Sequence, residues 1–376
     1  MQKNLWSITS FLENKNYKFN KENIFTQLPE KFIDEAIEAI SSWDDYTPTP
    51  LIELKKLNDE LKFKNIYYKD EDKRFDLKSF KALGGAFAVY KIASEKNNIT
   101  VSTATAGNHG RSVAWGAQRL GLKCKIFISE FVSESRAEAM RKLDAEVIRV
   151  KGNYDNSLKE CIKQSKENNW EIVQDVSWEG YKEVPKLIMA GYTIMIKEIL
   201  DEVKSNSISH VFLQAGVGGM AAAMIAGFAK LSQNIPKFII VEPENADCVF
   251  QSIKNNKPTS VDIKKETVMG GMSCGDVSSI AWEILKNSSN YCLTISDEAI
   301  STTVALLAEK RLSDEKIIAG ECAVPGIIAL ISSFNNKEYL DKLELNEQSN
   351  VLLFGCEGLT DSAMYQKLLS DGLQKI

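Results

Sequence analysis

Histidine and paired cysteines are scarce in this chain, and their scarcity argues against the common kinds of metal site. Among 376 residues there are two histidines and seven cysteines. The cysteines are scattered and none forms a Cys-x-x-Cys pair, so the usual spacings of zinc ligands are missing. We therefore expect no metal site, and we expect the cysteines to serve mainly as small buried apolar residues.

Long apolar runs and a strong charge of one sign are also missing. The first 11 residues hold no apolar run long enough for a signal peptide, and no stretch of 18 apolar residues could span a membrane. The net charge of -5 argues against a surface dedicated to nucleic acid or to anionic membranes. An odd number of cysteines without a secretion signal fits a reducing compartment. We expect a cytoplasmic protein with neither nucleic acid nor membrane as its partner.

Short apolar strands alternate with amphipathic helices from about residue 65 onward. Strands are predicted at 65–69, 101–105, 123–128, 146–150, 210–214, 237–242 and 351–354. Helices are predicted at 80–91, from 110 to a stop at Gly121, from Ser135 with a capping-box Glu138, and at 158–166, 188–203 and 220–231. The first 45 or so residues and the polar stretch 255–267 are expected to lie outside the core. The alternation predicts an α/β fold with a mostly parallel sheet covered on both faces.

A glycine-rich segment, Gln214–Ala221 (QAGVGGMA), stands directly between a predicted strand and a predicted helix. Glycines permit a tight turn that points several backbone amides at one place, and the following helix adds its positive end. Such a loop can bind a phosphate, although it lacks the Gly-Lys-Ser/Thr ending of nucleoside triphosphatases and the GxGxxG spacing. Taken alone, a tight turn without a ligand is an equally good interpretation.

Two further segments each allow a functional and an ordinary interpretation. Lys81 lies among the apolar residues Phe80, Ala82 and Leu83. Lost solvation lowers the pKa of a lysine, and only a neutral amine forms a Schiff base, but a surface lysine covering apolar neighbours is more common. The segment Thr103–Gly110 (TATAGNHG) forms a small-residue turn that can hold a carboxylate, and its Asn108 can donate to a ring oxygen or simply cap a helix.

Together and in this order, the three segments resemble the fold-type II enzymes that use pyridoxal phosphate, which include threonine dehydratase and the tryptophan synthase β-chain. Similarity to the diaminopropionate ammonia-lyase family is more specific. It rests on Arg74–Gly85 (RFDLKSFKALGG), Gly107–Arg111 (GNHGR), Gln174–Tyr181 (QDVSWEGY), Val241–Cys248 (VEPENADC), Met269–Gly275 (MGGMSCG) and Glu357–Asp361 (EGLTD). The resemblance implies two three-layer α/β/α domains with mostly parallel sheets. A large cofactor-binding domain would comprise 1–85 and 190–376, with a smaller domain inserted at 86–189, in a homodimer.

The resemblance also implies roles for individual residues. Lys81 would bind pyridoxal phosphate as a Schiff base and then move protons, and Asp175 would manage protons or pair with a β-ammonium of the substrate. The residues implied for cofactor binding are Lys81, Asn108, Gly216, Val217, Gly218, Gly219, Met220 and Cys356. Those implied for substrate binding are Thr105, Ala106, Gly107, His109 and Asp175. Cys356 would stand beside the pyridine nitrogen, where a thiol favours β-elimination, or else be a buried apolar residue.

One position departs from the family pattern. The resemblance implies an aspartate immediately before the Gly-Asn-His segment, where this chain has Ala106. That aspartate is associated with the α-proton of the D-isomer, which leaves from the face opposite Lys81. Because alanine cannot accept a proton, we hypothesise action on the L-isomer only, with Lys81 as the base, or on another β-substituted amino acid. Family members also carry cysteines at Cys248 and Cys274, for which a disulfide and two free thiols both stay open.

The function that this resemblance implies is α,β-elimination of 2,3-diaminopropionate, as the L-isomer, to pyruvate and two molecules of ammonia. A serine/threonine-type dehydratase or another β-eliminating lyase would need the same machinery. A catalytically silent protein that binds pyridoxal phosphate is the non-enzymatic alternative. The intact Lys81, Asn108 and glycine loop argue against that alternative, because a chain without catalysis has little need of the reactive lysine.

Overall fold

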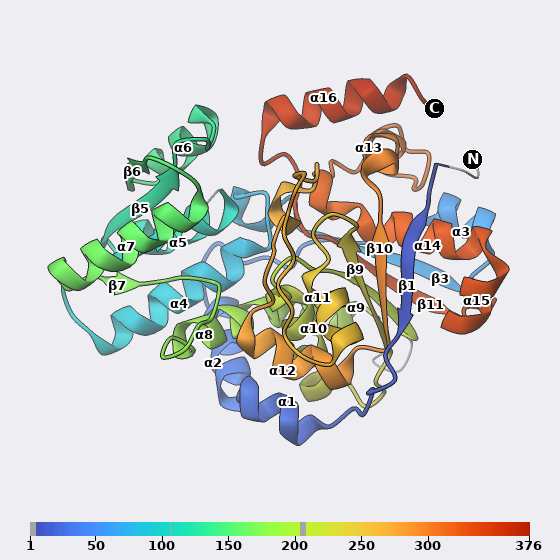
Figure 1. Cartoon of the computed structure of the whole chain (residues 1–376), viewed down its shortest axis with the longest axis horizontal. Coiled ribbons are helices and arrows are strands. Elements are labelled where there is room, and N and C mark those ends of the chain that lie inside the picture. Colours follow the sequence, from blue (N-terminus) through green and yellow to red (C-terminus); the bar gives the residue numbers. More distant parts are fainter. Residues whose placement is uncertain (1–4, 106, 204–207) are drawn as a thin grey trace. The chain divides into compact units, whose positions relative to one another are not determined.

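The computed structural model describes residues 5–105, 107–203 and 208–376, which form two compact units (Figure 1). The first unit consists of the described residues in Met1–Pro29, Pro48–Lys73 and Met195–Ile376. The second consists of those in Glu30–Thr47 and Arg74–Ile194. The predicted inserted domain, residues 86–189, falls within the second unit.

The first unit is built on a mostly parallel sheet with the strand order β1-β10-β9-β8-β11-β3-β2. The strands are β1 (Ile8–Glu13), β2 (Leu51–Glu53), β3 (Asn65–Asp70), β8 (His210–Gln214), β9 (Lys237–Pro243), β10 (Tyr291–Ile295) and β11 (Asn350–Gly355). The edge strands β1 and β2 are antiparallel to their neighbours, and the inner pairs are parallel. Every residue of β8, β10 and β11 is buried. Both faces of the sheet are therefore covered, as continuous apolar strands require.

Helices surround this sheet. They are α1 (Lys21–Gln27), α3 (Lys55–Leu61), α9 (Ile194–Glu202), α10 (Gly219–Leu231), α11 (Cys248–Asn255), α12 (Ser279–Ser288), α13 (Ile300–Ala308), α14 (Pro325–Asn335), α15 (Lys337–Leu343) and α16 (Ser362–Leu373), with short 3-10 turns η2 (Gly270–Met272), η3 (Asp297–Ala299) and η4 (Glu321–Ala323). Helix α14 packs across β1, β8, β9, β10 and β11. Its residues from Pro325 to Ser333 are all buried, which is typical of a helix that is apolar all round.

The second unit has its own parallel sheet, in the order β6-β5-β4-β7. Its elements are α2 (Glu30–Ser41), η1 (Arg74–Asp76), α4 (Lys81–Glu95), β4 (Thr100–Ala104), α5 (Asn108–Arg119), β5 (Lys123–Ser129), α6 (Glu134–Arg141), β6 (Glu146–Val150), α7 (Tyr154–Asn168), β7 (Glu171–Ile172) and α8 (Glu183–Tyr192). A Cβ on Gly84 would lie 2.4 Å from the carbonyl oxygen of Ile188 in α8, and one on Gly85 would lie 2.3 Å from Oγ of Ser112 in α5. The two glycines therefore let α4, and Lys81 at its start, lie close against both helices.

The predicted α/β fold and the predicted strands are confirmed, with boundaries that differ by one or two residues. The segment 256–269, which includes nearly all of the polar stretch 255–267, has no helix or strand. Among the described residues, no helix combines the length and the apolar character needed to cross a bilayer.

Three predictions about local structure are wrong. Ser133, not Ser135, caps α6, because Ser133 has an extended backbone and its side chain accepts from the amide of Arg136. The helix predicted at 188–203 is divided into α8 and α9 at Thr193.

The described part of the N-terminal 45 residues contributes buried side chains to the core instead of lying wholly outside it. In the first unit, β1 pairs with β10, and the two lie side by side in Figure 1 although they are far apart in the sequence. Ile24 of α1 is 1% exposed, and in the second unit Ile33 and Ile40 of α2 are fully buried.

Candidate active site

Lys81 is the first residue of α4, and its side chain is 26% exposed. Its Nζ donates to Oδ2 of Asp175 at 2.5 Å. The same nitrogen lies 5.5 Å from the ring centre of Phe80 and 5.9 Å from that of Tyr192, within the range of cation–π attraction. The two rings pack edge to face at 4.7 Å. The amine therefore stands between two aromatic rings and an acid, a setting very different from that of a solvated surface lysine.

Asp175 is positioned by the residue before it. Gln174 is 1% exposed, and its Oε1 accepts from Oγ1 of Thr103 and from the amide of Ala104 at 2.9 and 3.0 Å. Its Nε2 donates to the carbonyl oxygen of Ala104 and to the hydroxyl of Tyr154 at 2.9 and 2.8 Å. The Gln174 side chain thus ties the segment after β7 to the end of β4, the neighbouring parallel strand. Asp175 and the turn before α5 therefore lie at the same edge of the sheet, where the parallel strands β4 and β7 end.

The rest of the QDVSWEGY segment forms a rigid turn that supports this arrangement. Tyr181 stacks on Trp178 with ring centres 4.1 Å apart, and the two residues exchange backbone hydrogen bonds. The Tyr181 hydroxyl donates to the carbonyl oxygen of Ile172 and accepts from the amide of Gln174. The aromatic pair therefore braces the segment that carries Asp175.

The turn before α5 holds several predicted substrate-binding residues. Oγ1 of Thr105 accepts from the amides of Gly107 and Gly110 at 3.0 and 3.2 Å, which fixes the start of the helix. Gly107 is the N-cap and Asn108 the first helical residue. A Cβ on Gly110 would lie 2.4 Å from Cγ2 of Thr105, so this close turn requires glycine. Ala106 lies outside the described residues.

His109 is buried beside Asp175. Its Nε2 lies 2.7 Å from the carbonyl oxygen of Val173, so this nitrogen carries a proton and donates it. Its Nδ1 lies 3.8 Å from Oδ2 of Asp175. Burial lowers the pKa of His109, against the opposing charge of Asp175. The ring is therefore neutral at physiological pH.

Asp175 itself is ionised in this setting. Burial alone would raise the pKa of its carboxyl, but the charge of Lys81 and the hydrogen bond from its Nζ oppose burial and hold that pKa well below its ordinary range. Tyr192 behaves in the opposite way, because burial raises the pKa of its hydroxyl and keeps the hydroxyl protonated. The second unit therefore presents a lysine amine, an ionised acid and a neutral imidazole in one group.

The glycine loop lies in the first unit, after β8. Gly218 has φ of +88°, a left-handed conformation, and its Cβ would lie 2.8 Å from Cδ1 of Leu285. Gly219 begins α10, whose N-cap Gly218 offers no side-chain hydrogen bond to the first turn. A Cβ on Gly219 would meet no atom of the described chain within 4 Å, so the helix start faces open space. The amides of this turn and the positive helix end suit a phosphate group.

Cys356 follows β11, the strand that neighbours β8 in the sheet. Its Sγ donates to the carbonyl oxygen of Cys322 at 3.1 Å, and the side chain is 4% exposed. Nε2 of Gln214 donates to the same carbonyl at 2.9 Å and to that of Phe354 at 2.7 Å. Gln214 thus links the carboxyl ends of two parallel strands, where α/β folds place their ligands.

A buried group in the first unit has the residue types of a metal site. Potential ligand atoms of Glu321, Cys322 and Glu357 lie within 4.8 Å of one another. Oε1 of Glu357 already accepts from the amide of Cys322. Burial raises the pKa of the Cys322 thiol well above its ordinary value, which disfavours the thiolate that binds metals. The expectation of no metal site stays a prediction.

The predicted site residues therefore form two groups, one in each unit. Lys81, Thr105, Gly107, His109 and Asp175 belong to the second, as does Asn108, and Gly216–Met220 and Cys356 belong to the first. None of the seven cysteines, all of which lie in the described part of the chain, is in a disulfide. Cys248 and Cys274 are therefore unbridged, although Sγ of Cys248 donates to the carbonyl oxygen of Gly216.

Sequence reasoning gave no role to two residues that the structure places in the site. Gln174 stood in a quoted motif, but its partners on β4 and α7 lie about 70 and 20 residues away in the sequence. Tyr192 is the last residue of α8, and the centre of its ring lies 5.9 Å from Nζ of Lys81. No local pattern marks it, because only the packing of α8 on α4 brings it there.

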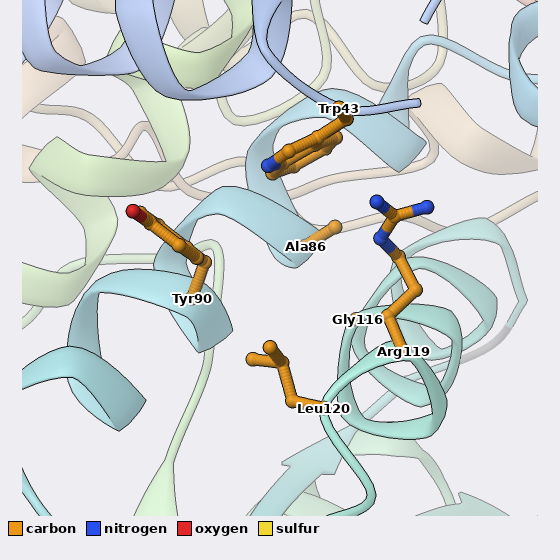
Figure 2. Close-up of a pocket in the computed structure, with 6 residues that line it drawn as sticks. All are labelled: Trp43, Ala86, Tyr90, Gly116, Arg119 and Leu120. Atoms are coloured by element: carbon orange, nitrogen blue, oxygen red, sulfur yellow. The ribbon is translucent and has the colours of Figure 1, made fainter. Parts of the chain in front are cut away.

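A separate hollow in the second unit is lined by other residues (Figure 2). They are Trp43, Ala86, Tyr90, Gly116, Arg119 and Leu120. The Arg119 guanidinium lies over the rings of Trp43 and Trp115, at 5.0 and 4.7 Å, and pairs with Asp45. The charged group of this hollow is already engaged by its own chain, and none of the predicted site residues lines it.

Known proteins are similar to this chain along nearly its whole length. The model of the family described as "Pyridoxal-phosphate dependent enzyme" matches residues 43–357. The chain is 32% identical to the diaminopropionate ammonia-lyase of Escherichia coli strain K12, covering 96% of each protein. It is 33% identical to that of Salmonella typhimurium, covering 87% of this chain and 89% of the relative.

A solved structure agrees with these relationships. The crystal structure of the Escherichia coli lyase in complex with an aminoacrylate-PLP azomethine reaction intermediate superposes with a TM-score of 0.89 at 31% identity, covering 98% of each chain. Similarity of this extent includes the segments that carry Lys81, Asp175 and the glycine loop. The chain therefore belongs to the pyridoxal-phosphate dependent enzymes and, among them, to the diaminopropionate ammonia-lyase family.

Proposed function

We propose that this chain is an ammonia-lyase that converts L-2,3-diaminopropionate to pyruvate and two molecules of ammonia, with pyridoxal phosphate as its cofactor. The observation that carries the proposal is the contact between Nζ of Lys81 and Oδ2 of Asp175 at 2.5 Å. A substrate with a second ammonium group needs an anionic partner, and Asp175 is held ionised. The relationship to curated diaminopropionate ammonia-lyases supports the same substrate class.

The residues of this chain fit the cofactor group by group. Lys81 supplies the amine that bonds to the cofactor, and Phe80 and Tyr192 shield that amine from water. The amides of Gly216–Met220 and the start of α10 would hold the phosphate. Asn108 would bind the ring oxygen, and Cys356 would provide a thiol for the ring nitrogen. When bound, the cofactor withdraws electrons from the α-carbon of the substrate and so stabilises the charge left by the α-proton.

Proton and charge handling fall to three parts of the second unit. Lys81 takes the α-proton, for which its neutral amine is the base. Asp175 holds the β-ammonium, so that this group departs as ammonia without an additional acid. The turn Thr105–His109 and the positive end of α5 hold the substrate carboxylate, since backbone amides gather there.

We propose that the enzyme acts on the L-isomer. Position 106 holds alanine, which cannot accept the proton that leaves the D-isomer on the face opposite Lys81. Lys81 is then the only proposed base, and it removes the α-proton only from the face of the substrate on its own side. Purified enzyme should release pyruvate from L- but not from D-2,3-diaminopropionate, and equal turnover of both isomers would contradict this proposal.

The test of the substrate is a comparison of kcat/KM among L-2,3-diaminopropionate, L-serine and L-threonine, with pyruvate or oxobutyrate and ammonia measured. The proposal expects diaminopropionate to have the highest value. A higher value for serine or threonine would favour the dehydratase alternative. A cofactor absorbance band with no ammonia released from any amino acid would favour a silent cofactor-binding protein.

We also propose that the enzyme is a cytoplasmic homodimer. The resemblance to the lyase family supports the dimer, and the odd number of scattered cysteines supports a reducing compartment. Sedimentation equilibrium of the loaded enzyme should give twice the mass of one chain. Fractionation of the source cells should recover the protein with cytosolic markers.

A further inference from the structure

One buried group in the site has an atom that the proposed chemistry does not use. Nδ1 of His109 is buried and, within the described residues, has no hydrogen-bond partner. The side chain is 5% exposed, so water does not readily reach that nitrogen. Buried nitrogens without partners are rare, and each calls for a physical reason.

The tautomer of His109 is fixed by the backbone. A carbonyl oxygen can only accept, so Nε2, at 2.7 Å from the oxygen of Val173, must carry the proton. The neutral ring therefore turns the lone pair of Nδ1 toward Oδ2 of Asp175, at 3.8 Å. Two acceptors face each other there, an arrangement that becomes favourable as soon as one of them gains a proton.

The same carboxylate oxygen serves Lys81. Oδ2 of Asp175 accepts from Nζ of Lys81 at 2.5 Å and lies 3.8 Å from Nδ1 of His109. The charged groups that act on His109 are Asp175, from the segment after β7, and Lys81, from α4. His109 also lies in the first turn of α5, whose positive end disfavours a cation. While Lys81 carries its ammonium, His109 is kept neutral by all of these except Asp175.

We propose that His109 takes up a proton at Nδ1 when the ammonium of Lys81 is no longer beside Asp175, and so becomes the cation that pairs with that carboxylate. The proton comes from Nζ of Lys81 through Oδ2, or from solvent. Before the transfer the charges are +1 on Lys81, -1 on Asp175 and 0 on His109, and afterwards they are 0, -1 and +1. A shift of about 1 Å brings Nδ1 from 3.8 Å to hydrogen-bond distance of Oδ2.

The consequence for catalysis rests on the proposed function. Once Lys81 is bonded to the cofactor, the place of a cation beside Asp175 is open either to His109 in its protonated form or to the β-ammonium of the substrate. Binding of diaminopropionate then requires His109 to release its proton. In this role the side chain of His109 acts through Asp175 and not on the substrate, whereas the turn that contains His109 holds the substrate carboxylate only through its backbone. The imidazole is therefore a positioning group.

The chain is well suited to a direct test, because His109 and His210 are its only histidines. In full-length protein labelled with nitrogen-15 histidine, each ring gives its own signals. His210 is an internal reference in the first unit, with hydrogen bonds to Ser209 and to the carbonyl oxygen of Leu343. Burial lowers the pKa of His210 to about 4.

The experiment compares the cofactor-free wild type with Lys81→Met and with the double variant Lys81→Met/Asp175→Asn. The proposal expects the pKa of His109 to rise in Lys81→Met and to fall again in the double variant, while His210 titrates unchanged in all three. An unchanged His210 signal shows that the first unit keeps its fold, and an unchanged circular dichroism spectrum shows that the whole chain does. An equal pKa of His109 in the wild type and in Lys81→Met would overturn the proposal.

A second measurement follows the loaded enzyme. The His109→Gln variant keeps a donor for the carbonyl of Val173 but has no group that titrates. In the wild type, kcat/KM for diaminopropionate should fall on the acid side as His109 retains its proton, mainly through KM. His109→Gln should lose this acid limb, whereas a purely structural role would lower activity at every pH alike and would contradict the proposal. If His109 titrates as expected but diaminopropionate is not consumed, only the proposed function fails.

Discussion

The side chain of Gln174 connects the segment that carries Asp175 to β4 by hydrogen bonds. From these bonds we predict how much stability is lost when Gln174 is replaced. Gln174→Leu removes four hydrogen bonds and leaves the amide and carbonyl of Ala104 and the hydroxyl of Thr103 without their partner. Thr103 and Ala104 are fully buried, so water cannot replace the lost groups. At about 1 kcal/mol for each of these three groups, the variant loses about 3 kcal/mol of unfolding free energy.

Thermal unfolding followed by circular dichroism measures this loss. At about 2–4 °C per kcal/mol, Tm should fall by roughly 6–12 °C. The matched control is Gln118→Leu on α5, whose exposed side chain bonds only to Asp144 and should cost about 0.5 kcal/mol or less. Activity should also fall in Gln174→Leu, because Asp175 loses its support. A Tm no lower than that of the Gln118→Leu control would refute this account of the site.

Three further predictions concern single side chains. Asp175→Asn should lower kcat/KM for diaminopropionate about 10- to 100-fold, because a charge-assisted contact contributes about 1.5–3 kcal/mol. The same variant should lower kcat/KM for L-serine less. An equal loss for both substrates would argue against pairing of Asp175 with the β-ammonium. Burial raises the pKa of Asp70 to about 6, so its contribution to stability is present below its unfolded pKa and is lost as pH rises through about 6. Asp70→Asn should therefore raise Tm relative to wild type at pH 7.5 but not at pH 4, with exposed Asp59→Asn as the control. Ala106→Asp should gain pyruvate release from the D-isomer, and no gain would remove position 106 as the cause of selectivity.

Sequence patterns predicted those parts of the molecule that are encoded locally. The strand His210–Gln214 is continuous and apolar because both of its faces are buried, and the glycines after it follow from the conformation of Gly218. The segment of Lys81 could be recognised because Gly84 and Gly85, which let α4 pack closely against its neighbours, follow shortly after Lys81 in the sequence. Such features leave a local signature, since the physical requirement falls on neighbouring residues.

Features that depend on distant partners could not be predicted from the sequence. β1 is a partly exposed edge strand whose pairing with β10 joins segments nearly 300 residues apart. No proline stands at the break, and Gly191, two residues before Thr193, is required by close packing, because its Cβ would lie 2.8 Å from Cα of Gly84. The Thr193 hydroxyl bonds to the carbonyl of Ala190 as any such threonine in a helix can. The contact between Lys81 and Asp175 likewise spans 94 positions and exists only because β4 and β7 are neighbours.

The central claim is that this chain removes two amino groups from one diaminopropionate molecule, with Lys81 as the essential amine. The most direct test is the ratio of ammonia to pyruvate released from L-2,3-diaminopropionate by the purified, cofactor-loaded enzyme, with Lys81→Ala as the inactive control. The proposed reaction predicts two molecules of ammonia for each pyruvate, and no product from Lys81→Ala. A ratio of one, or full activity in Lys81→Ala, would contradict it.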